Sequence, residues 1–402
     1  RRNPTKVALM KEGRAAFFEP GLDEIVARNV KAGRLIPTTS YEESLPQSEV
    51  VFICVDTPLS SDGSADMSQV EAAVTQMAPL LPDGTIVVIK STVPVGSNGR
   101  VEALLKQGLA SGVHITMASS PEFLRQGNAI EDTFRPDRIV IGTDDPSTRD
   151  VLLKLHASFP GERVVCDIAS AELIKYASNS FLATSISYAN ELALLCEAAG
   201  ADMTTVARAM RLDKRIGPHA FIDAGLGYGG SCFPKDVPAL VAMARDFNVP
   251  VHILPAVARV NQHARIRVID CVQKLLPNPT EAVVAFWGLS FKPRTDDIRS
   301  APSIDIIRTL LGLGYKVRAY DPVAITRVKS ILPDVTYSEN AFAAADGADC
   351  LLLVTDWDEF RECDRTKLRQ VMRTPNVIDG RNIWNPSEMR ALGFIYSSIG
   401  RP

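Results

Sequence analysis

Short, continuously apolar runs alternate with helical patterns along this chain, and no other feature constrains the fold more. In the first part of the chain these runs lie at residues 50–55, 85–90, 113–117 and 138–142. A strand that is apolar on both faces needs cover on both faces, which helices provide around a parallel sheet. The first part of the chain is therefore predicted to be an α/β domain with a parallel sheet.

A second group of runs predicts another α/β domain after the turn-forming segment Pro277-Asn278-Pro279. Strands are predicted at 282–288, 316–320 and 350–354, with a helix near 303–313. This alternation is Rossmann-like but lacks the complete glycine fingerprint of dinucleotide-binding folds. We therefore expect the second domain to bind a nucleotide in a different way.

Between the two groups lies one long helical pattern, from Ile168 to about Ala199, without an internal glycine or proline. Its length exceeds that of an ordinary globular helix, so we expect it to connect two domains. Helical stretches that begin near Val237 and Val251 complete a helical middle section. We therefore expect two Rossmann-like parallel-sheet domains joined by a long central helix and a helical middle domain. The predicted domains are residues 1–167, 168–278 and 279–402.

Length and composition agree with two or three domains and exclude some classes of function. A chain of 402 residues is too long for one ordinary core, and its net charge of −3 argues against nucleic-acid binding. Apolar runs stay short of the ~20 residues that span a bilayer, so we expect no membrane segment. The seven cysteines form no Cys-x-x-Cys pair, which is typical of reduced thiols in a cytoplasmic protein. The five histidines show no metal-ligand spacing, so we expect no metal site.

The most informative local motif is a glycine-rich loop that ends at Cys232, just before Pro234. Glycines let the backbone approach a ligand closely, and a proline suits the first turn of a helix. A thiol at a helix N-terminus beside a lysine, here Lys235, ionises more readily and can act as a nucleophile. The alternative is a buried structural cysteine beside a tight turn.

The segment Gly225–Asp236 resembles the active-site cysteine motif of the UDP-glucose/GDP-mannose dehydrogenase family, and the resemblance covers essentially the whole chain. Arg215-Ile216-Gly217-Pro218 and the Gly-Tyr-Gly-Gly sequence favour the members that oxidise UDP-glucose. The resemblance implies an NAD-dependent, four-electron oxidation of UDP-glucose to UDP-glucuronate, through a thiohemiacetal and a thioester on Cys232. It also implies a homodimer. The alternatives are oxidation of GDP-mannose or UDP-N-acetylmannosamine, or an inactive fragment that binds a sugar nucleotide without NAD.

Lys175 and Asn179 stand four residues apart in the long helical pattern, so both project from one face. A lysine and an amide on that face can stabilise a developing oxyanion, although an isolated pair of this kind also suits a solvated helix face. The surrounding residues 171–179 are similar to the family's catalytic helix motif. The resemblance therefore implies that Lys175 and Asn179 stabilise the oxygen on the reacting carbon.

Glu122 lies in Ser119–Gly127, which follows a strand, where doubly wound sheets place ligand sites. A carboxylate there can act as a general base, or it can cap a helix. The resemblance implies that Glu122 activates water for thioester hydrolysis, with Thr92 positioning that water and Asp236 assisting proton transfer. Gln126 stands where many family members have a second glutamate, and its amide cannot titrate.

The resemblance also implies a cofactor site and a substrate site. Arginines suit such sites because their guanidinium fork matches phosphate oxygens. The expected cofactor-binding residues are Thr57, Pro58, Thr92 and Arg299. The expected substrate-binding residues are Phe123, Leu124, Lys175, Arg215, Phe221, Gly225, Tyr228, Gly229, Phe291, Lys292 and Arg381.

Two features of the first domain argue against strong NAD binding. The chain opens at Arg1 without the strand, glycine turn, helix and second strand that precede this segment in the family. We therefore expect the first domain to be truncated at its N-terminus. Asp56 stands where the family usually has glycine, and its carboxylate either faces the expected cofactor phosphates or caps a turn.

Overall fold

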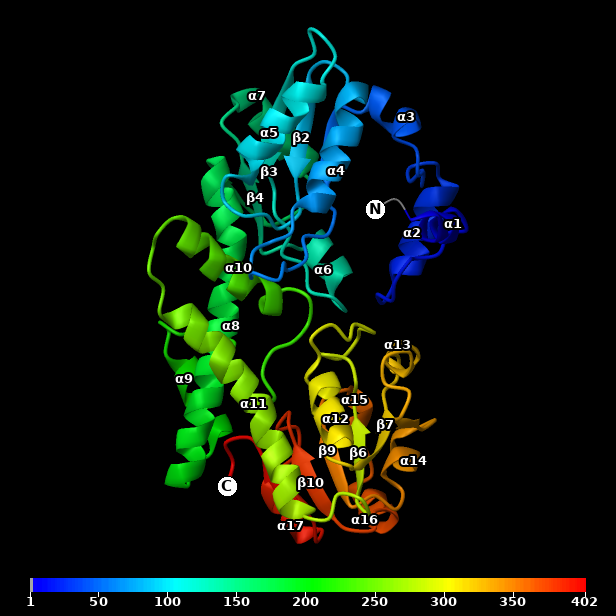
Figure 1. The fold of residues 1–402 in the computed structure, drawn as a ribbon, viewed down its shortest axis with the longest axis vertical. Coiled ribbons are helices and arrows are strands. Elements are labelled where there is room, and N and C mark those ends of the chain that lie inside the picture. Colours follow the sequence, from blue (N-terminus) through cyan, green and yellow to red (C-terminus); the bar gives the residue numbers. More distant parts are fainter. Residues whose placement is uncertain (1–2) are drawn as a thin grey trace. The chain divides into compact units, whose positions relative to one another are not determined.

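The computed structural model describes residues 3–402, which form two compact units (Figure 1). The first unit comprises the chain up to Ser178 together with Pro238–Pro250, and the second comprises Asn179–Val237 and Val251–Pro402. Helices α8 (Ile168–Ala199) and α10 (Phe233–Asp246) each run from one unit into the other. The long helix expected from the sequence is thus confirmed, while the three expected domains stay a prediction.

The sheet of the first unit has its strands in sequential order. The pairs β1–β2, β2–β3 and β4–β5 are parallel, as predicted, but β3 meets β4 antiparallel through Ser119 and Gly142. Helix α6 (Ala129–Phe134) lies in the segment that connects β3 to β4. Strand β5 was not predicted. The strands are β1 (Val50–Ile53), β2 (Thr85–Ile89), β3 (Ile115–Ser119), β4 (Arg138–Gly142) and β5 (Glu162–Cys166).

Helices cover both faces of this sheet, which explains why its central strands are apolar throughout. Along β2, Val87 and Ile89 pack with α4 (Ser68–Met77) and α5 (Ser97–Gly108) on one face. Ile86 and Val88 pack with α7 (Pro146–Leu155) on the other, because successive strand residues point to opposite faces. The other helical segments of this unit are α1 (Pro4–Lys11), α2 (Leu22–Lys31), α3 (Tyr41–Ser44), η1 (Leu45–Gln47) and η2 (Ala78–Leu80).

A buried carboxylate on α8 caps the N-terminus of α5. Glu172 accepts hydrogen bonds from the backbone N–H groups of Gly96 (2.7 Å) and Asn98 (2.8 Å), and from the Asn98 side-chain amide (2.8 Å). The first N–H groups of a helix have no partner within the helix, and a carboxylate there also complements the helix dipole. Glu172 therefore supplies, through a tertiary contact, the cap that the glycine at the N-cap position cannot provide.

The second unit contains a sheet whose strand pairs are all parallel, in the order β11–β10–β9–β6–β7–β8, which confirms the second parallel sheet expected from the sequence. Strands β6, β7 and β9 coincide with predicted strands. The strands are β6 (Val283–Trp287), β7 (Lys316–Tyr320), β8 (Thr336–Tyr337), β9 (Cys350–Leu353), β10 (Asn376–Asp379) and β11 (Ile395–Ser398). The helices that lie wholly in this unit are α9 (Met203–Leu212), α11 (Ile253–Leu275), α12 (Pro302–Gly312), α13 (Ile325–Lys329), α14 (Ala341–Ala345), α15 (Asp358–Arg361), α16 (Arg365–Val371) and α17 (Pro386–Ala391).

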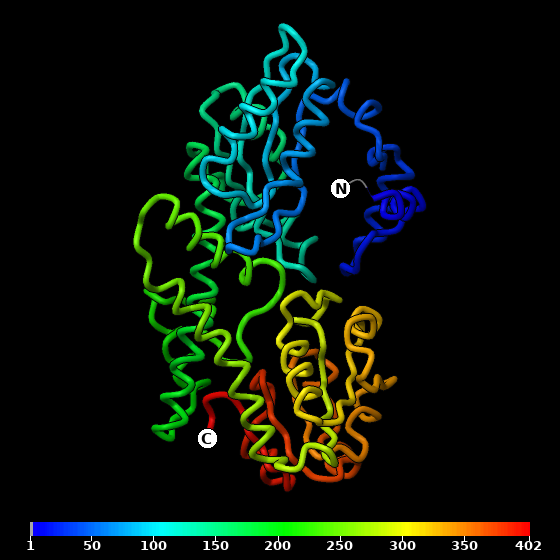
Figure 2. Tube along the Cα trace, viewed as in Figure 1, coloured from blue at the N-terminus to red at the C-terminus, as the bar shows by residue number. Residues whose placement is uncertain are grey.

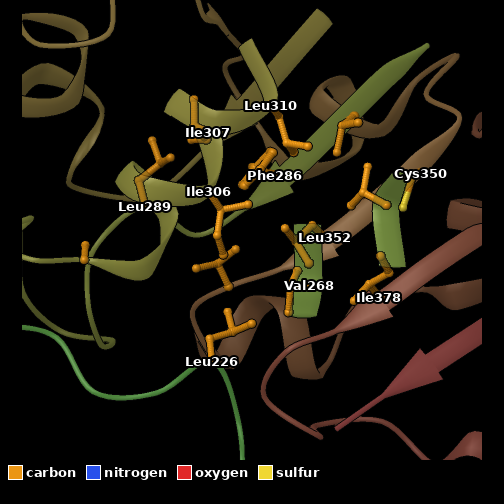
Figure 3. Packing of buried hydrophobic residues seen from close by; sticks show 14 of the residues in the cluster. Leu226, Val268, Phe286, Leu289, Ile306, Ile307, Leu310, Cys350, Leu352 and Ile378 are labelled. Atoms are coloured by element: carbon orange, nitrogen blue, oxygen red, sulfur yellow. The ribbon is translucent and has the colours of Figure 1, made fainter. Parts of the chain in front are cut away.

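The main core of the second unit joins its sheet to α11 and α12. Phe286 of β6 and Leu352 of β9 pack with α12 and with Val268 of α11 (Figure 3). α11 contacts α12 and β10, as the trace in Figure 2 shows. Leu226, from the glycine-rich loop, is fully buried in the same cluster (Figure 3). The loop that leads to Cys232 is therefore anchored in the core of the second unit.

Replacing Glu172 by alanine is expected to destabilise the first unit by about 2–3 kcal/mol, because buried donors at the start of α5 lose a charged acceptor. The control is Glu102→Ala, which removes the partly exposed partner of Lys106 and should cost less than about 0.5 kcal/mol. Urea unfolding followed by circular dichroism measures both losses. Equal losses would contradict the capping role of Glu172.

Candidate active site

Cys232 lies at the exit of the glycine-rich loop and forms the N-cap of α10. Its carbonyl oxygen accepts the backbone N–H groups of Lys235 (3.1 Å) and Asp236 (2.8 Å). Its thiol is half-buried, with Sγ 3.6 Å from the Ser231 hydroxyl oxygen. The structure therefore places Cys232 at a helix N-terminus, as the sequence predicted, while the Lys235 ammonium binds Asp236.

Helix α10 begins at Phe233, so the cysteine motif indicated its start correctly, whereas the helical stretch expected from near Val237 begins about one turn too late. Pro234 stands at the second helical position, where its missing N–H loses no partner. Pro238 lies inside the helix and gives up one backbone hydrogen bond, to the carbonyl of Pro234. The helix starts early enough to include both prolines because Cys232 caps its first turn.

Asp236 has no exposed surface, and its carboxylate is held from two sides. Asn179 Nδ2 donates to Oδ2 (2.5 Å), and the Lys235 ammonium donates to Oδ1 (2.6 Å). A buried carboxylate is tolerated as an anion only with such compensation. The structure thus joins two of the expected catalytic residues, Asn179 and Asp236, at the first turn of α10.

A second group of expected residues gathers in the first unit. Lys175 Nζ lies 3.6 Å from Glu122 Oε1 and 5.1 Å from the ring centroid of Phe123. Glu122 Oε2 accepts the backbone N–H of Leu124 (2.5 Å). Lys175 is buried, whereas Glu122 keeps 32% of its side-chain surface exposed. Glu122 therefore retains the access to water that a general base for hydrolysis needs.

Lys90, which the sequence analysis did not single out, lies near the same carboxylate. The last residues of β1 and β2 pair with each other, so Cys54 and Lys90 follow at neighbouring positions. Burial lowers the pKa of Lys90, while the nearby Cys54 and Glu122 oppose that shift. The sequence signal for this site was a lysine directly after an apolar strand.

The expected cofactor residues of the first unit lie beyond the carboxyl ends of β1 and β2. Thr57 Oγ1 donates to the carbonyl oxygen of Thr92 (2.7 Å), which joins the two loops. Thr57 is buried and Thr92 half-buried, whereas Asp56 and Pro58 are exposed. Open α/β sheets bind nucleotides at this edge. The N-terminus of α5 at this edge is closed to a phosphate because Glu172 already caps it.

In the second unit, Arg381 connects several of the expected substrate residues. Its Nη2 donates to the Phe291 carbonyl oxygen (3.1 Å) and its Nε to the Val354 carbonyl oxygen (2.5 Å). A Cβ on Gly225 would lie 3.9 Å from Arg381 Nη1, and Lys292 Nζ lies 5.6 Å from the ring centroid of Phe291. Burial lowers the pKa of Arg381, opposed by nearby aspartates. The structure therefore gathers Gly225, Phe291, Lys292 and Arg381 in one place.

Two glycines allow the loop before Cys232 to pack closely against its surroundings. Gly227 and Gly230 both have φ of +83°, which side chains rarely tolerate. A Cβ on Gly227 would lie 2.3 Å from Asn261 Oδ1, and one on Gly230 would lie 2.8 Å from the Phe291 ring. Tyr228 between them is buried, and this burial raises its pKa to about 12.

Gly229 and Arg299 belong to the same neighbourhood. A Cβ on Gly229 would lie 2.5 Å from the carbonyl oxygen of Ser300, and the carbonyl oxygen of Arg299 accepts the N–H of Gly230 (2.9 Å). Arg299 Nη2 donates to Asp297 Oδ2 (2.6 Å). Backbone contacts therefore fix the loop before Cys232 against the segment that carries Arg299.

Arg215 and Phe221 do not join this group. Arg215 is exposed and pairs with Asp213 (2.6 Å), and Phe221 has 53% of its surface exposed. Their expected roles in substrate binding stay predictions. The sequence also leads us to expect that Cys232 shares one cavity with Lys175 and Glu122, and this expectation stays a prediction.

Three sequence models of one family match consecutive parts of the chain. Residues 2–160 match the NAD binding domain of the UDP-glucose/GDP-mannose dehydrogenase family, residues 169–263 match its central domain, and residues 285–386 match its UDP binding domain. The chain belongs to the UDP-glucose/GDP-mannose dehydrogenase family. The family predicted from the glycine-rich cysteine motif is thereby confirmed.

Several family members are similar along nearly their whole length. UDP-glucose 6-dehydrogenase YwqF of Bacillus subtilis is 45% identical over 98% of this chain and 90% of that protein. A UDP-glucose 6-dehydrogenase of Pseudomonas aeruginosa is 45% identical over 100% of this chain and 91% of that protein. Among solved structures, a UDP-glucose dehydrogenase from Pyrobaculum islandicum has a TM-score of 0.92 at 37% identity, covering 100% of this chain and 91% of that one. The solved structure therefore shares the fold of this chain.

Within residues 3–402, His, Cys, Asp and Glu side chains form no group that could hold a metal ion. Over the same residues, no helix is both long and apolar enough to cross a bilayer. The seven cysteines all lie in this part of the chain and are unpaired.

Replacing Lys90 by methionine is expected to change how stability depends on alkaline pH. Because burial depresses the pKa of Lys90 in the folded chain, the unfolded chain binds more protons there between the depressed value and 10.5, the ordinary lysine value. The free energy of unfolding of the native chain should therefore rise relative to that of Lys90→Met as pH increases through this window. Urea unfolding at several pH values measures the difference.

Lys106→Met is the matched control, because Lys106 is largely exposed. Its effect on the free energy of unfolding should stay nearly constant over the same pH range. A Lys90→Met effect that is also constant would contradict the depressed pKa of Lys90.

Proposed function

We propose that this chain is an NAD-dependent UDP-glucose 6-dehydrogenase that oxidises the C6 alcohol of UDP-glucose to a carboxylate. The observation that carries the proposal is the half-buried Cys232 thiol at the N-cap of α10, beside a buried carboxylate held by Asn179 and Lys235. Relatives named UDP-glucose 6-dehydrogenases are 36–45% identical over nearly the whole chain, which supports this substrate over GDP-mannose and UDP-N-acetylmannosamine.

The overall reaction removes four electrons from C6 as two hydrides and adds one water. NAD, when bound, supplies the hydride acceptor for both oxidations. In the first oxidation the C6 hydroxyl loses its proton and C6 loses a hydride, which leaves an aldehyde. Lys175 and Asn179 stabilise negative charge on the C6 oxygen during this change. The amide of Asn179 is already fixed by its hydrogen bond to Asp236, which orients it for that task.

Cys232 makes the second oxidation possible. Its thiolate adds to the aldehyde carbon, and the resulting thiohemiacetal loses a hydride to become a thioester. Glu122 then takes a proton from water, whose oxygen forms the new bond to C6 as the C6–sulfur bond breaks. The products of this step are a carboxylate and the free Cys232 thiolate. Glu122 suits the task because its carboxylate is partly exposed and lies beside the Lys175 ammonium.

The residues at the carboxyl edge of the first sheet fit a dinucleotide. Pro58 is exposed and Thr92 is half-buried at that edge. The hydrogen bond from Thr57 to Thr92 holds together the loops that follow β1 and β2. Thr57, Pro58 and Thr92 would bind NAD from this unit, and Arg299 would bind a cofactor phosphate. Asp56 is exposed at the same edge, so its carboxylate can turn toward solvent rather than toward a phosphate.

The second unit is proposed to bind the nucleotide end of the substrate. Arg381 is half-buried beside Gly225, and its charge suits the diphosphate. The remaining proposed substrate contacts are Phe123, Leu124, Lys175, Arg215, Phe221, Tyr228, Gly229, Phe291 and Lys292. We also propose the division into domains at residues 1–167, 168–278 and 279–402, which the three consecutive family matches support.

A homodimer through α8 is part of the proposal. Phe181, Tyr188 and Leu195 recur every seven residues on this helix, and they are 71%, 50% and 62% exposed. An apolar stripe of this spacing is typical of helix–helix contact. A second copy of the same helix would cover these side chains.

Incubation of the chain with UDP-glucose and excess NAD is expected to produce two NADH for each UDP-glucose consumed. Cys232→Ser should lower kcat by at least about 10³-fold, because a hydroxyl forms neither the thiohemiacetal nor the thioester readily. Absorbance at the NADH band and chromatography of the sugar nucleotides measure both quantities.

Cys166→Ser is the control, since Cys166 ends strand β5 outside the proposed machinery, and it should keep native turnover. Undiminished turnover in Cys232→Ser would contradict the mechanism. Faster turnover with GDP-mannose or UDP-N-acetylmannosamine than with UDP-glucose would contradict the proposed substrate.

A further inference from the structure

Asn261 is a polar residue at a buried position of a helix. The buried positions of α11 are Val257, Asn261, Ala264, Val268 and Val272, which form one stripe along the helix. A buried amide costs free energy unless its donors and acceptor find partners. The partners of Asn261 therefore show what this residue does.

The oxygen and the nitrogen of the Asn261 side-chain amide both bind the backbone of Tyr228 in the glycine-rich loop. Asn261 Oδ1 accepts the backbone N–H of Tyr228 (2.6 Å), and Nδ2 donates to the Tyr228 carbonyl oxygen (3.1 Å). One turn later, Arg265 Nη2 donates to the same carbonyl oxygen (2.7 Å) and to the Ser300 carbonyl oxygen (3.0 Å). The guanidinium also pairs with Asp305. Two side chains of one rigid helix thus fix the backbone at Tyr228.

Further contacts restrain the loop on either side of Tyr228. Asn190 Oδ1 accepts the N–H of Gly225 (2.8 Å), and Leu226 is buried in the core of the second unit (Figure 3). The Tyr228 ring packs edge-on against Phe233, the first residue of α10, with ring centroids 5.8 Å apart. The anchored tyrosine therefore contacts the helix start that Cys232 caps.

We propose that Asn261 and Arg265 are positioning residues for Cys232, a role that rests on the proposed function. Three residues separate Tyr228 from Cys232, and two of them are glycines. Because glycines adopt many backbone conformations, this segment holds Cys232 in place only if the backbone at Tyr228 is itself fixed. Asn261 and Arg265 fix the backbone at Tyr228. They therefore determine where Cys232 Sγ lies when it adds to the aldehyde carbon.

The geometry explains why an amide and a guanidinium are used. Asn261 is the side chain that satisfies the Tyr228 N–H, while the carbonyl receives donors from both residues. Loss of Asn261 would leave a buried N–H without its acceptor and would free space beside Gly227, whose backbone approaches Asn261 closely. The loop could then shift toward α11. Displacement of a reacting group by about 1 Å costs on the order of 10²-fold in rate.

The test is Asn261→Ala, examined by hydrogen exchange and by steady-state kinetics. The amides of Tyr228 and Gly230 should exchange at least about tenfold faster than in the native chain, because the loop opens without global unfolding. With UDP-glucose and NAD, kcat should fall about 10²-fold while KM for NAD stays within about twofold.

Asn261→Asp keeps the acceptor for the Tyr228 N–H and should recover much of the loss. Arg265→Gln loses one donor to the Tyr228 carbonyl and serves as a milder second variant should Asn261→Ala not fold.

Asn376→Ala is the matched control. Asn376 is an equally buried asparagine of the second unit, whose amide donates to the Asp349 carbonyl oxygen in the sheet (2.8 Å). Asn376→Ala should lower the free energy of unfolding. It should not speed hydrogen exchange of the Tyr228 amide, and it should not lower kcat selectively. If Asn261→Ala and Arg265→Gln match this control in both readouts, the positioning role is overturned. If the native chain shows no turnover, the proposed function fails, while hydrogen exchange still decides whether the two residues hold the loop.

Discussion

The buried Asp236 carboxylate is the interaction on which the candidate site depends. Its two oxygens are held by an amide from α8 and an ammonium from α10, so it joins the start of one helix to the middle of another. Removal of Lys235 would leave a buried charge without its ion-pair partner, which is strongly destabilising, and removal of Asn179 would leave one carboxylate oxygen without its donor. The same bonds orient Asn179 and fix the first turn that Cys232 caps. The Asp236 carboxylate therefore both stabilises this part of the fold and orients groups that the proposed reaction uses.

The glycine-rich loop has the complementary task of bringing backbone close to other groups. Its glycines lie against Asn261, Phe291 and the Ser300 carbonyl at distances that exclude side chains. Leu226, near the start of the loop, is buried in the core, which helps this glycine-rich segment keep one conformation. The loop is thus held by an apolar anchor and polar side chains rather than by its own secondary structure.

Much of this fold was predictable because it depends on local patterns. Continuous apolar runs such as 85–90 indicated strands covered on both faces, and the unbroken pattern from Ile168 to Ala199 indicated the long helix. The antiparallel meeting of β3 and β4 was missed because an apolar run indicates a strand but not its direction in the sheet. The start of α10 was indicated by Cys232 and Pro234, although the helical pattern by itself suggested a start near Val237, one turn later.

The candidate site was predictable only where its residues belong to a recognisable motif. Cys232, Asp236, Asn179, Lys175 and Glu122 came from such motifs, and each lies beside another member of the set in its own unit. Lys90, Asn261 and Arg265 were missed because their roles arise from contacts between distant segments. A polar residue in the buried stripe of α11 was the one available signal for Asn261.

The most direct test of the account is peptide mapping of the Glu122→Gln variant, quenched with acid during reaction with UDP-glucose and NAD. The account predicts a covalent sugar-nucleotide adduct on the peptide that contains Cys232, because loss of the general base slows thioester hydrolysis by about 10²–10⁴-fold. NADH release without any adduct, or an adduct on a different residue, would contradict Cys232 as the nucleophile.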